Sequence, residues 1–237
     1  MQPSLMQTCS GKLLLLLVSN LLLCGNANVT SAPTRDKGNR QCNVSLQELF
    51  KEAITVSAKI SKRASVLFAQ FDRHYTMKQQ FQNRAFGRCH THSLGAPQTK
   101  KDAAELPTKF LMKLMPAILN AWKKPLYHLV TELSGRHGAP SQIVNMVRYI
   151  EEKCVRLQGV VGRIKIKLRL HYEEKKYPEW SGLAALQSAD TKDARFAFYN
   201  LLHCLRSDMQ KVHNYLHVVK CEAAPDQSCK SHGRHSI

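Results

Sequence analysis

Residues 141–168 read SQIVNMVRYIEEKCVRLQGVVGRIKIKL, and the spacing of their apolar side chains indicates the fold class. Those side chains recur at alternating intervals of four and three residues, at Ile143, Val147, Ile150, Cys154, Leu157, Val161, Ile164 and Leu168. Such a period forms one apolar stripe along an α-helix, as in helices that pack into bundles. Ser141, which follows Pro140, is the predicted N-cap. Residues 163–171 alternate basic and apolar side chains, which also fits a short strand, but we interpret them as a basic, frayed helix end.

Three further segments have helical spacing. The predicted helices cover residues 46–75, 110–133, 141–168 and 191–219. Ser45–Glu48 has the S-x-x-E form of a capping box at the start of the first helix. Pro116 and Pro125 lie inside the second helix, where each removes a backbone donor and is expected to kink it. The fourth helix begins at Asp190 or Thr191.

The connections between these helices differ in length. Over thirty residues separate the first two helices, about six the second and third, and about twenty the third and fourth. A short link makes neighbouring helices antiparallel, whereas a long link can run the length of a bundle and make them parallel. The sequence therefore predicts an all-α, up-up-down-down four-helix bundle with two long crossover connections.

The first thirty residues have the pattern of a secretory signal peptide. Lys12 is the only charged residue before Arg35, and it precedes a largely apolar stretch at 13–23. This stretch is shorter than the ~20 residues that span a bilayer. We therefore expect a secreted protein without membrane insertion. The predicted organisation is a signal peptide at 1–27 (cleavage as late as residue 32 is the alternative), a flexible basic segment at 28–41, a four-helix domain at 42–229 and a flexible tail at 230–237.

The formal net charge of +18 arises from 35 Lys and Arg against 17 Asp and Glu. A hydrophobic fraction of 43% excludes a disordered chain. A charge this positive favours an acidic partner. Basic residues are spread over all the helices, with local density at 163–169 and at 59–63, and they lack the interleaved aromatic residues that stack on bases. We therefore expect no nucleic-acid partner, and heparan sulfate is the acidic partner to consider.

Catalytic motifs are missing, because the sequence has no G-x-S-x-G, no glycine-rich phosphate loop and no H-E-x-x-H. We expect no enzymatic activity and no cofactor. His213 and His217 place two imidazoles on one helical face and could form half of a zinc site, with two exposed histidines as the alternative. Cys89–His92 also contains metal-ligand types, but a disulfide cysteine is the preferred interpretation. Asn43 is the predicted glycosylation site, and Asn28 lies in a second sequon.

Six cysteines remain after removal of the signal peptide. They are Cys42, Cys89, Cys154, Cys204, Cys221 and Cys229. In an oxidising compartment we expect disulfides, although the sequence alone leaves their pairing open.

Several segments resemble the prolactin and placental lactogen family of growth hormone-like four-helix cytokines. They are residues 42–50 (CNVSLQELF), 71–75 (FDRHY), 89–94 (CHTHSL), 125–133 (PLYHLVTEL), 177–183 (YPEWSGL) and 198–206 (FYNLLHCLR). The resemblance spans residues 42–229. It implies a secreted hormone that binds the ectodomain of a class I cytokine receptor and promotes receptor dimerisation, and the chain looks like a divergent placental prolactin-related member.

The resemblance also implies a disulfide pairing. It pairs Cys89 with Cys204 and Cys221 with Cys229. Cys42 matches the second cysteine of an N-terminal bridge whose first cysteine is missing here, so it is a candidate for intermolecular pairing. Cys154 falls on the apolar stripe of the third helix and is expected to be a buried free thiol. A bridge between Cys42 and Cys154 is the alternative.

Two receptor-binding faces are implied by the same resemblance. The first comprises Lys211, Tyr215, His213 and His217 on the fourth helix, and His90, Pro97 and Lys100 in the first crossover. The second centres on a small cleft at a glycine of the third helix. We aligned that position with Val160, one residue after Gly159, so that the valine is expected to fill the cleft.

Several first-face positions depart from the prolactin pattern, among them Ser61, Gln210 and His213. We therefore expect weak or absent agonism on the ordinary prolactin receptor. The alternative function is a non-lactogenic placental factor that acts through another receptor or is retained by heparan sulfate.

Overall fold

The computed structural model describes residues 44–75, 81, 85–135, 139–173, 175–177 and 179–232. The chain divides into two units, Met1–Val44 and Ser45–Ile237, and the described helices belong to the second. The predicted signal peptide, the 28–41 segment, Cys42 and the sequons at Asn28 and Asn43 lie outside the described residues.

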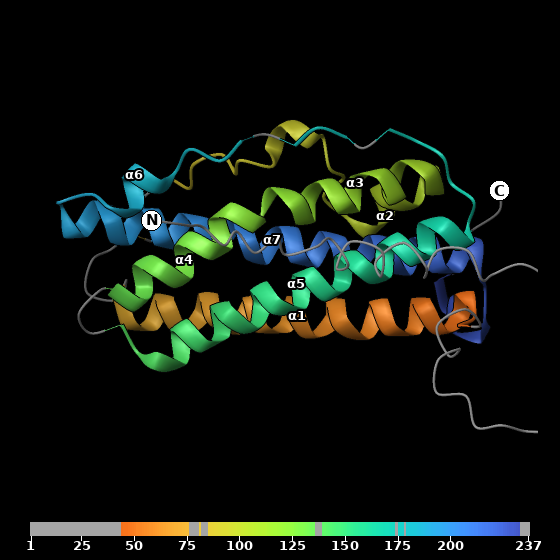
Figure 1. Cartoon of the computed structure of the whole chain (residues 1–237), viewed down its shortest axis with the longest axis horizontal. Coiled ribbons are helices and arrows are strands. Elements are labelled where there is room, and N and C mark those ends of the chain that lie inside the picture. Colours follow the sequence, from red (N-terminus) through yellow and green to blue (C-terminus); the bar gives the residue numbers. More distant parts are fainter. Residues whose placement is uncertain are drawn as a thin grey trace, which may run out of the picture. The chain divides into compact units, whose positions relative to one another are not determined.

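Helices make up the ordered elements of the described residues, with no strand among them. The long helices are α1 (Leu46–Tyr75), α3 (Thr108–Ala121), α4 (Lys123–Gly135), α5 (Ser141–Lys167) and α7 (Thr191–Ala223). The connections contain η2 (His92–Leu94), α2 (Lys100–Ala104) and α6 (Leu183–Leu186), and η3 (Gln227–His232) follows α7. The all-α prediction is confirmed. In Figure 1, α1 and the α3–α4 pair run in one direction, while α5 and α7 run in the opposite one.

The core lies where α1 packs against both α5 and α7. The apolar stripe predicted for the third helix is buried from Ile143 to Ile164. Phe50, Phe71, Trp122, Phe198 and Tyr215 are among the largest fully buried side chains. Burying an apolar side chain of this size stabilises a fold by about 1.5–3 kcal/mol, so these residues hold the helices together.

Of the two predicted helix caps, Ser45 is confirmed and Ser141 is not, and the start of α7 agrees with the predicted position. The Glu48 amide donates to Ser45 Oγ (3.2 Å), and the Ser45 amide donates to Glu48 Oε2 (2.8 Å), which completes the capping box. Asp190 caps α7 by accepting from the amides at positions 192 and 193. The prediction for Ser141 is wrong: it is the first helical residue, and Pro140 occupies the N-cap without a side-chain hydrogen bond.

The two prolines of the second predicted helix affect its continuity differently. The helix is broken at Trp122, between α3 and α4, one turn before Pro125. Pro125 cannot donate to the Ala121 carbonyl, and the His90 ring lies there instead, with Nε2 3.2 Å from that oxygen. At Pro116 the helix continues, and the vacant carbonyl of Met112 accepts a hydrogen bond from the Tyr172 hydroxyl.

The C-terminal end of α5 is capped, not frayed, and it is not a strand. The Leu170 amide donates to the Lys165 carbonyl (3.1 Å), and the Arg169 amide donates to the Ile166 carbonyl (2.9 Å). Arg169 has φ = 52°. These are the two hydrogen bonds and the left-handed residue of a Schellman motif, in which glycine is the usual occupant. The frayed-end prediction is therefore wrong.

Both disulfides implied by the resemblance are present. Cys89–Cys204 ties the connection between α1 and α3 to α7, and Cys221–Cys229 joins the end of α7 to η3. Cys154 is free and buried, as predicted from its place on the apolar stripe. Burial raises the pKa of the Cys154 thiol to about 12, so this group stays protonated and unreactive at neutral pH.

The two bridges close loops of very different length, 115 and 8 residues in sequence separation. Removing a bridge restores loop entropy to the unfolded chain. In the chain-entropy model, Cys89→Ala/Cys204→Ala should lower the free energy of unfolding by about 5 kcal/mol, and Cys221→Ala/Cys229→Ala by about 2.5 kcal/mol. Urea unfolding under non-reducing conditions measures both, and an equal or larger loss for the second pair would contradict the prediction.

Candidate functional site

A polar seam joins α1 to α7 within the otherwise apolar interface. His213 Nδ1 lies 2.9 Å from Ser57 Oγ, and Ser61 Oγ donates to Gln210 Oε1 (2.8 Å). Both serines are buried. The seam brings Ser61, Gln210 and His213, three positions that depart from the prolactin pattern, into one place. Ser57 was not predicted as a functional residue. Its position as a small polar residue within an apolar stripe could have revealed it.

His213 and His217 lie beside this seam with their rings packed edge to face, 4.7 Å between centroids. Both are half-buried. Burial, and then the charge of Lys100, lower the pKa of His213, so this imidazole is predominantly neutral at pH 7. The predicted residues Lys100, His213 and His217 are therefore brought together. In the part of the chain that the structure describes, no group of three His, Cys, Asp or Glu side chains could hold a metal ion.

Tyr215 and Lys211, two of the predicted first-face residues, both make contacts within the protein. Tyr215 is fully buried, and its hydroxyl donates to the carbonyl of Pro97. The Lys211 ammonium lies 3.2 Å from Asp208 Oδ1 with little exposure to solvent. The Tyr215 side chain therefore holds the first crossover against α7, whereas Lys211 contacts its own helix and is half-buried, as is Pro97.

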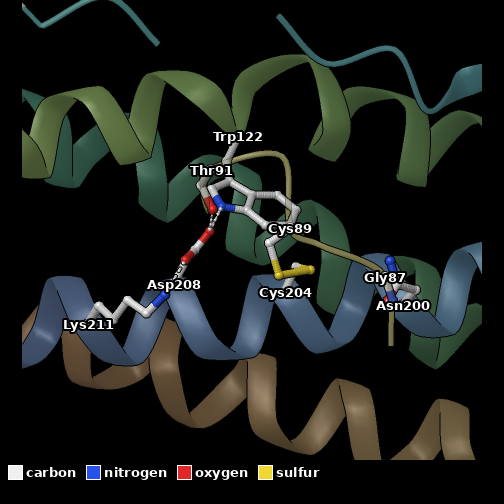
Figure 2. Close-up of a disulfide and its surroundings, with 8 residues drawn as sticks. All are labelled: Gly87, Cys89, Thr91, Trp122, Asn200, Cys204, Asp208 and Lys211. Atoms are coloured by element: carbon white, nitrogen blue, oxygen red, sulfur yellow. Dashed lines mark hydrogen bonds and ion pairs between the residues drawn. A yellow bond between two sulfur atoms is a disulfide. The ribbon is translucent and has the colours of Figure 1, made fainter. Parts of the chain in front are cut away.

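Asp208 is a buried carboxylate that the sequence analysis missed. Its Oδ2 accepts hydrogen bonds from Thr91 Oγ1 (2.6 Å) and from Trp122 Nε1 (2.9 Å). Figure 2 shows these donors converging on the carboxylate next to the Cys89–Cys204 bridge. The signal was present, because an acidic residue three positions after Leu205 lies on the inward face of the helix.

His90 packs against the break between α3 and α4 and not beside Lys100 and His213. Its ring meets the edge of Trp122, 4.8 Å between centroids, and Nε2 faces the Ala121 carbonyl. Burial lowers the pKa of His90, against an opposing effect of the Asp208 charge. His90 is half-buried at this junction, and its predicted part in the first face stays a prediction.

At the predicted second face, Gly159 and not Val160 reaches the surface. Val160 is only 1% exposed and faces the core, so the expectation that it fills a surface cleft is wrong. Gly159 is exposed, and a Cβ atom built on it would meet no heavy atom within 4 Å. Val155 and Ile166, on the same side of α5, are 60% and 74% exposed. This leaves an apolar strip with a gap at the glycine.

An ion pair links α1 to α5 near this strip. Glu52 accepts from Arg156 (2.8 Å) and from Arg163 (3.0 Å), which lie on either side of Gly159 in the sequence. The hydrogen bond from Arg156 is the main reason that the pKa of Glu52 is lowered. Because one carboxylate holds two guanidinium groups, the relative positions of α1 and α5 are defined at this face.

Protonation of the buried histidines should make the fold sensitive to acid. Burial lowers the native pKa of His90, His203 and His213 below the usual value near 6.5. Above that value both states are neutral and stability is complete. As the pH falls below it, the unfolded state binds protons first, so the free energy of unfolding decreases until the pH passes the native pKa values.

Urea unfolding at pH 7.5 and pH 5 should show this decrease, and His90→Gln should make it smaller. The glutamine amide can still donate toward Ala121 but does not titrate. The exposed residue His171 supplies the control, His171→Gln, which should keep the pH dependence of the unmodified protein. An unchanged pH dependence in His90→Gln would contradict the assignment.

A comparison with known protein families agrees with this architecture. The model of the somatotropin hormone family matches residues 16–229 of the 237-residue chain. That family consists of secreted hormones that bind class I cytokine receptors, and it is not a family of enzymes. No helix among the described residues is long and apolar enough to cross a membrane. The predicted relationship is confirmed: this chain belongs to the somatotropin hormone family.

Proposed function

We propose that the chain is a secreted hormone that binds the ectodomain of a class I cytokine receptor through two faces and thereby brings two receptors together. The observation that carries this proposal is the exposed gap at Gly159, which is bordered by apolar side chains on a rigid helix. Scattered exposed apolar residues are ordinary, but an apolar strip around an open backbone position favours contact with another protein.

The first face is the surface over the polar seam, where α1, α2 and α7 meet. Lys100, His213 and His217 provide its half-exposed polar groups. α2 starts with a complete capping box at Thr99 and Asp102, which holds Lys100 in place. Tyr215 anchors the backbone at Pro97 just before this helix. A pre-positioned crossover reduces the entropy that is lost on binding.

Receptor choice is the part of the function in which this chain is expected to differ from prolactin. Ser57 and Ser61 engage His213 and Gln210 within the protein, so these polar atoms are less available to a receptor. These commitments favour the second candidate, a non-lactogenic placental factor that acts through another class I receptor.

Gly159→Arg should block the second face without disturbing the first. The open space around Gly159 accommodates a long side chain without a steric clash, but the side chain would cover the apolar strip. With a cognate receptor ectodomain, the unmodified protein should form a 1:2 hormone–receptor complex by light scattering, and the variant should stop at 1:1. Gly135→Arg is the matched control, because Gly135 also has open space around it and lies at the end of α4.

The Gly135→Arg control should retain the 1:2 complex. A 1:2 complex of undiminished affinity with Gly159→Arg would refute the second face. Failure of the unmodified protein to bind any class I receptor ectodomain would refute the proposed function as a whole.

Selectivity can be tested in cells that carry only the ordinary prolactin receptor. We expect the purified protein to produce weak or no signalling in them, because Ser57 and Ser61 engage His213 and Gln210 within the protein. Prolactin serves as the positive control in the same cells. Signalling at full potency by this protein would contradict the expectation.

A further inference from the structure

A pocket of about 190 Å³ lies between α3, α5 and the connection that follows α5. Three lysines line it, one from each segment: Lys113, Lys165 and Lys175. Asn120, Gln158 and Tyr172 are the other polar side chains of its wall. Among the described residues no carboxylate lines it, and we name this cluster of three lysines and three neutral polar residues the lysine pocket.

The amino groups of these three lysines differ in their interaction partners from those of other lysines in the described residues. Lys124, Lys153 and Lys220 each pair with a carboxylate. Among the described residues no such ion pair involves a lysine of the pocket. The Lys165 ammonium lies 4.3 Å from the centroid of the Tyr172 ring, and the Lys175 ammonium donates to the Leu94 carbonyl. These contacts orient the amino groups but leave their positive charge uncompensated.

The neutral wall adds hydrogen-bond donors. Gln158 Nε2 donates to Asn120 Oδ1 (2.9 Å), which uses the oxygen of the asparagine amide. The Asn120 NH₂ group is left with no partner among the described residues. The Tyr172 hydroxyl already donates to Met112. The pocket therefore offers ammonium and amide donors and few acceptors, which suits an oxyanion.

Basic residues continue beyond the pocket along the exposed end of α5 and the following connection. They are Lys167, Arg169 and Lys176, all exposed. A single small anion would need only the pocket, whereas a polyanion would also use this row. The pocket lies on a different side of α5 from the Gly159 strip, because Gln158 and Lys165 each precede a strip residue by one position, a rotation of about 100°.

We propose that the lysine pocket binds a sulfate group of a heparan sulfate-type glycosaminoglycan, and that the exposed basic row binds the adjoining part of the same chain. This inference goes beyond receptor binding and does not require it. It also gives the excess of positive charge a location: three uncompensated, half-buried charges in one concave site, where electrostatic attraction is screened less than on an open surface.

The test uses a sulfated heparin octasaccharide as the probe and isothermal titration at 0.15 M salt. The pocket variant is Lys113→Gln/Lys165→Gln/Lys175→Gln. The matched control, Lys51→Gln/Lys59→Gln/Lys62→Gln, removes the same charge from exposed positions of α1. The pocket variant should bind about tenfold more weakly or worse, and the control less than about threefold more weakly. Equal losses in the two variants would overturn the proposal, since they would show that only overall charge matters.

A second measurement needs no variant. Bound octasaccharide should protect Lys113, Lys165 and Lys175 of the unmodified protein from an amine-acetylating reagent, as read by peptide mass spectrometry, while Lys59 and Lys62 remain reactive. Desulfated heparin should give no protection. Uniform protection, protection by the desulfated probe, or stronger protection by phosphatidylserine vesicles than by heparin would each overturn the assignment to a sulfated glycan.

Discussion

The buried carboxylate of Asp208 is the interaction on which the arrangement of the crossovers depends. Removing a carboxylate from water is costly unless charge and hydrogen bonds compensate it, and here Lys211, Thr91 and Trp122 do so from three different segments. The buried carboxylate and the segments that donate to it depend on each other. The carboxylate is tolerated only when the first crossover and the α3–α4 break are in place, and those segments are held because the carboxylate needs them. The Cys89–Cys204 bridge, one turn away on α7, covalently secures the same junction (Figure 2).

Backbone carbonyls that two prolines leave without a helical donor hold both long connections in the same way. Each proline of the second helical region removes a backbone donor, so a carbonyl four residues earlier lacks its partner. The first connection supplies His90 at Ala121, and the second supplies Tyr172 at Met112. A helix with ordinary residues at these positions would need neither contact. Interrupted helical hydrogen bonding thus attaches two long connections to the bundle, and those connections carry Lys100 and Lys175.

Several residues that were matched to the family by resemblance make contacts inside the protein. Tyr215, Lys211 and His90 match the family pattern, yet their side chains are occupied inside the protein. Tyr215 holds the first crossover against α7, and His90 attaches it to the break between α3 and α4. The positions that depart from the pattern, such as Gln210 and His213, lie in the seam beneath the first face. One fold can host different binding specificities, because function depends on the residues of a site and not on the fold itself.

Local chemistry determined much of the architecture from the sequence alone. The stripe at 143–164, the capping box at Ser45 and the start of the last long helix at 190–191 depend on neighbours within one or two turns, and the structure confirms them. The disulfide pairing became predictable only through the family resemblance. The tertiary structure decided the rest: that Ser141 does not cap, that Val160 faces the core, that Tyr215 is internal, and that three distant lysines share a pocket. The physical reason is that periodicity assigns a residue to a face of its helix, whereas only packing determines which segment covers that face.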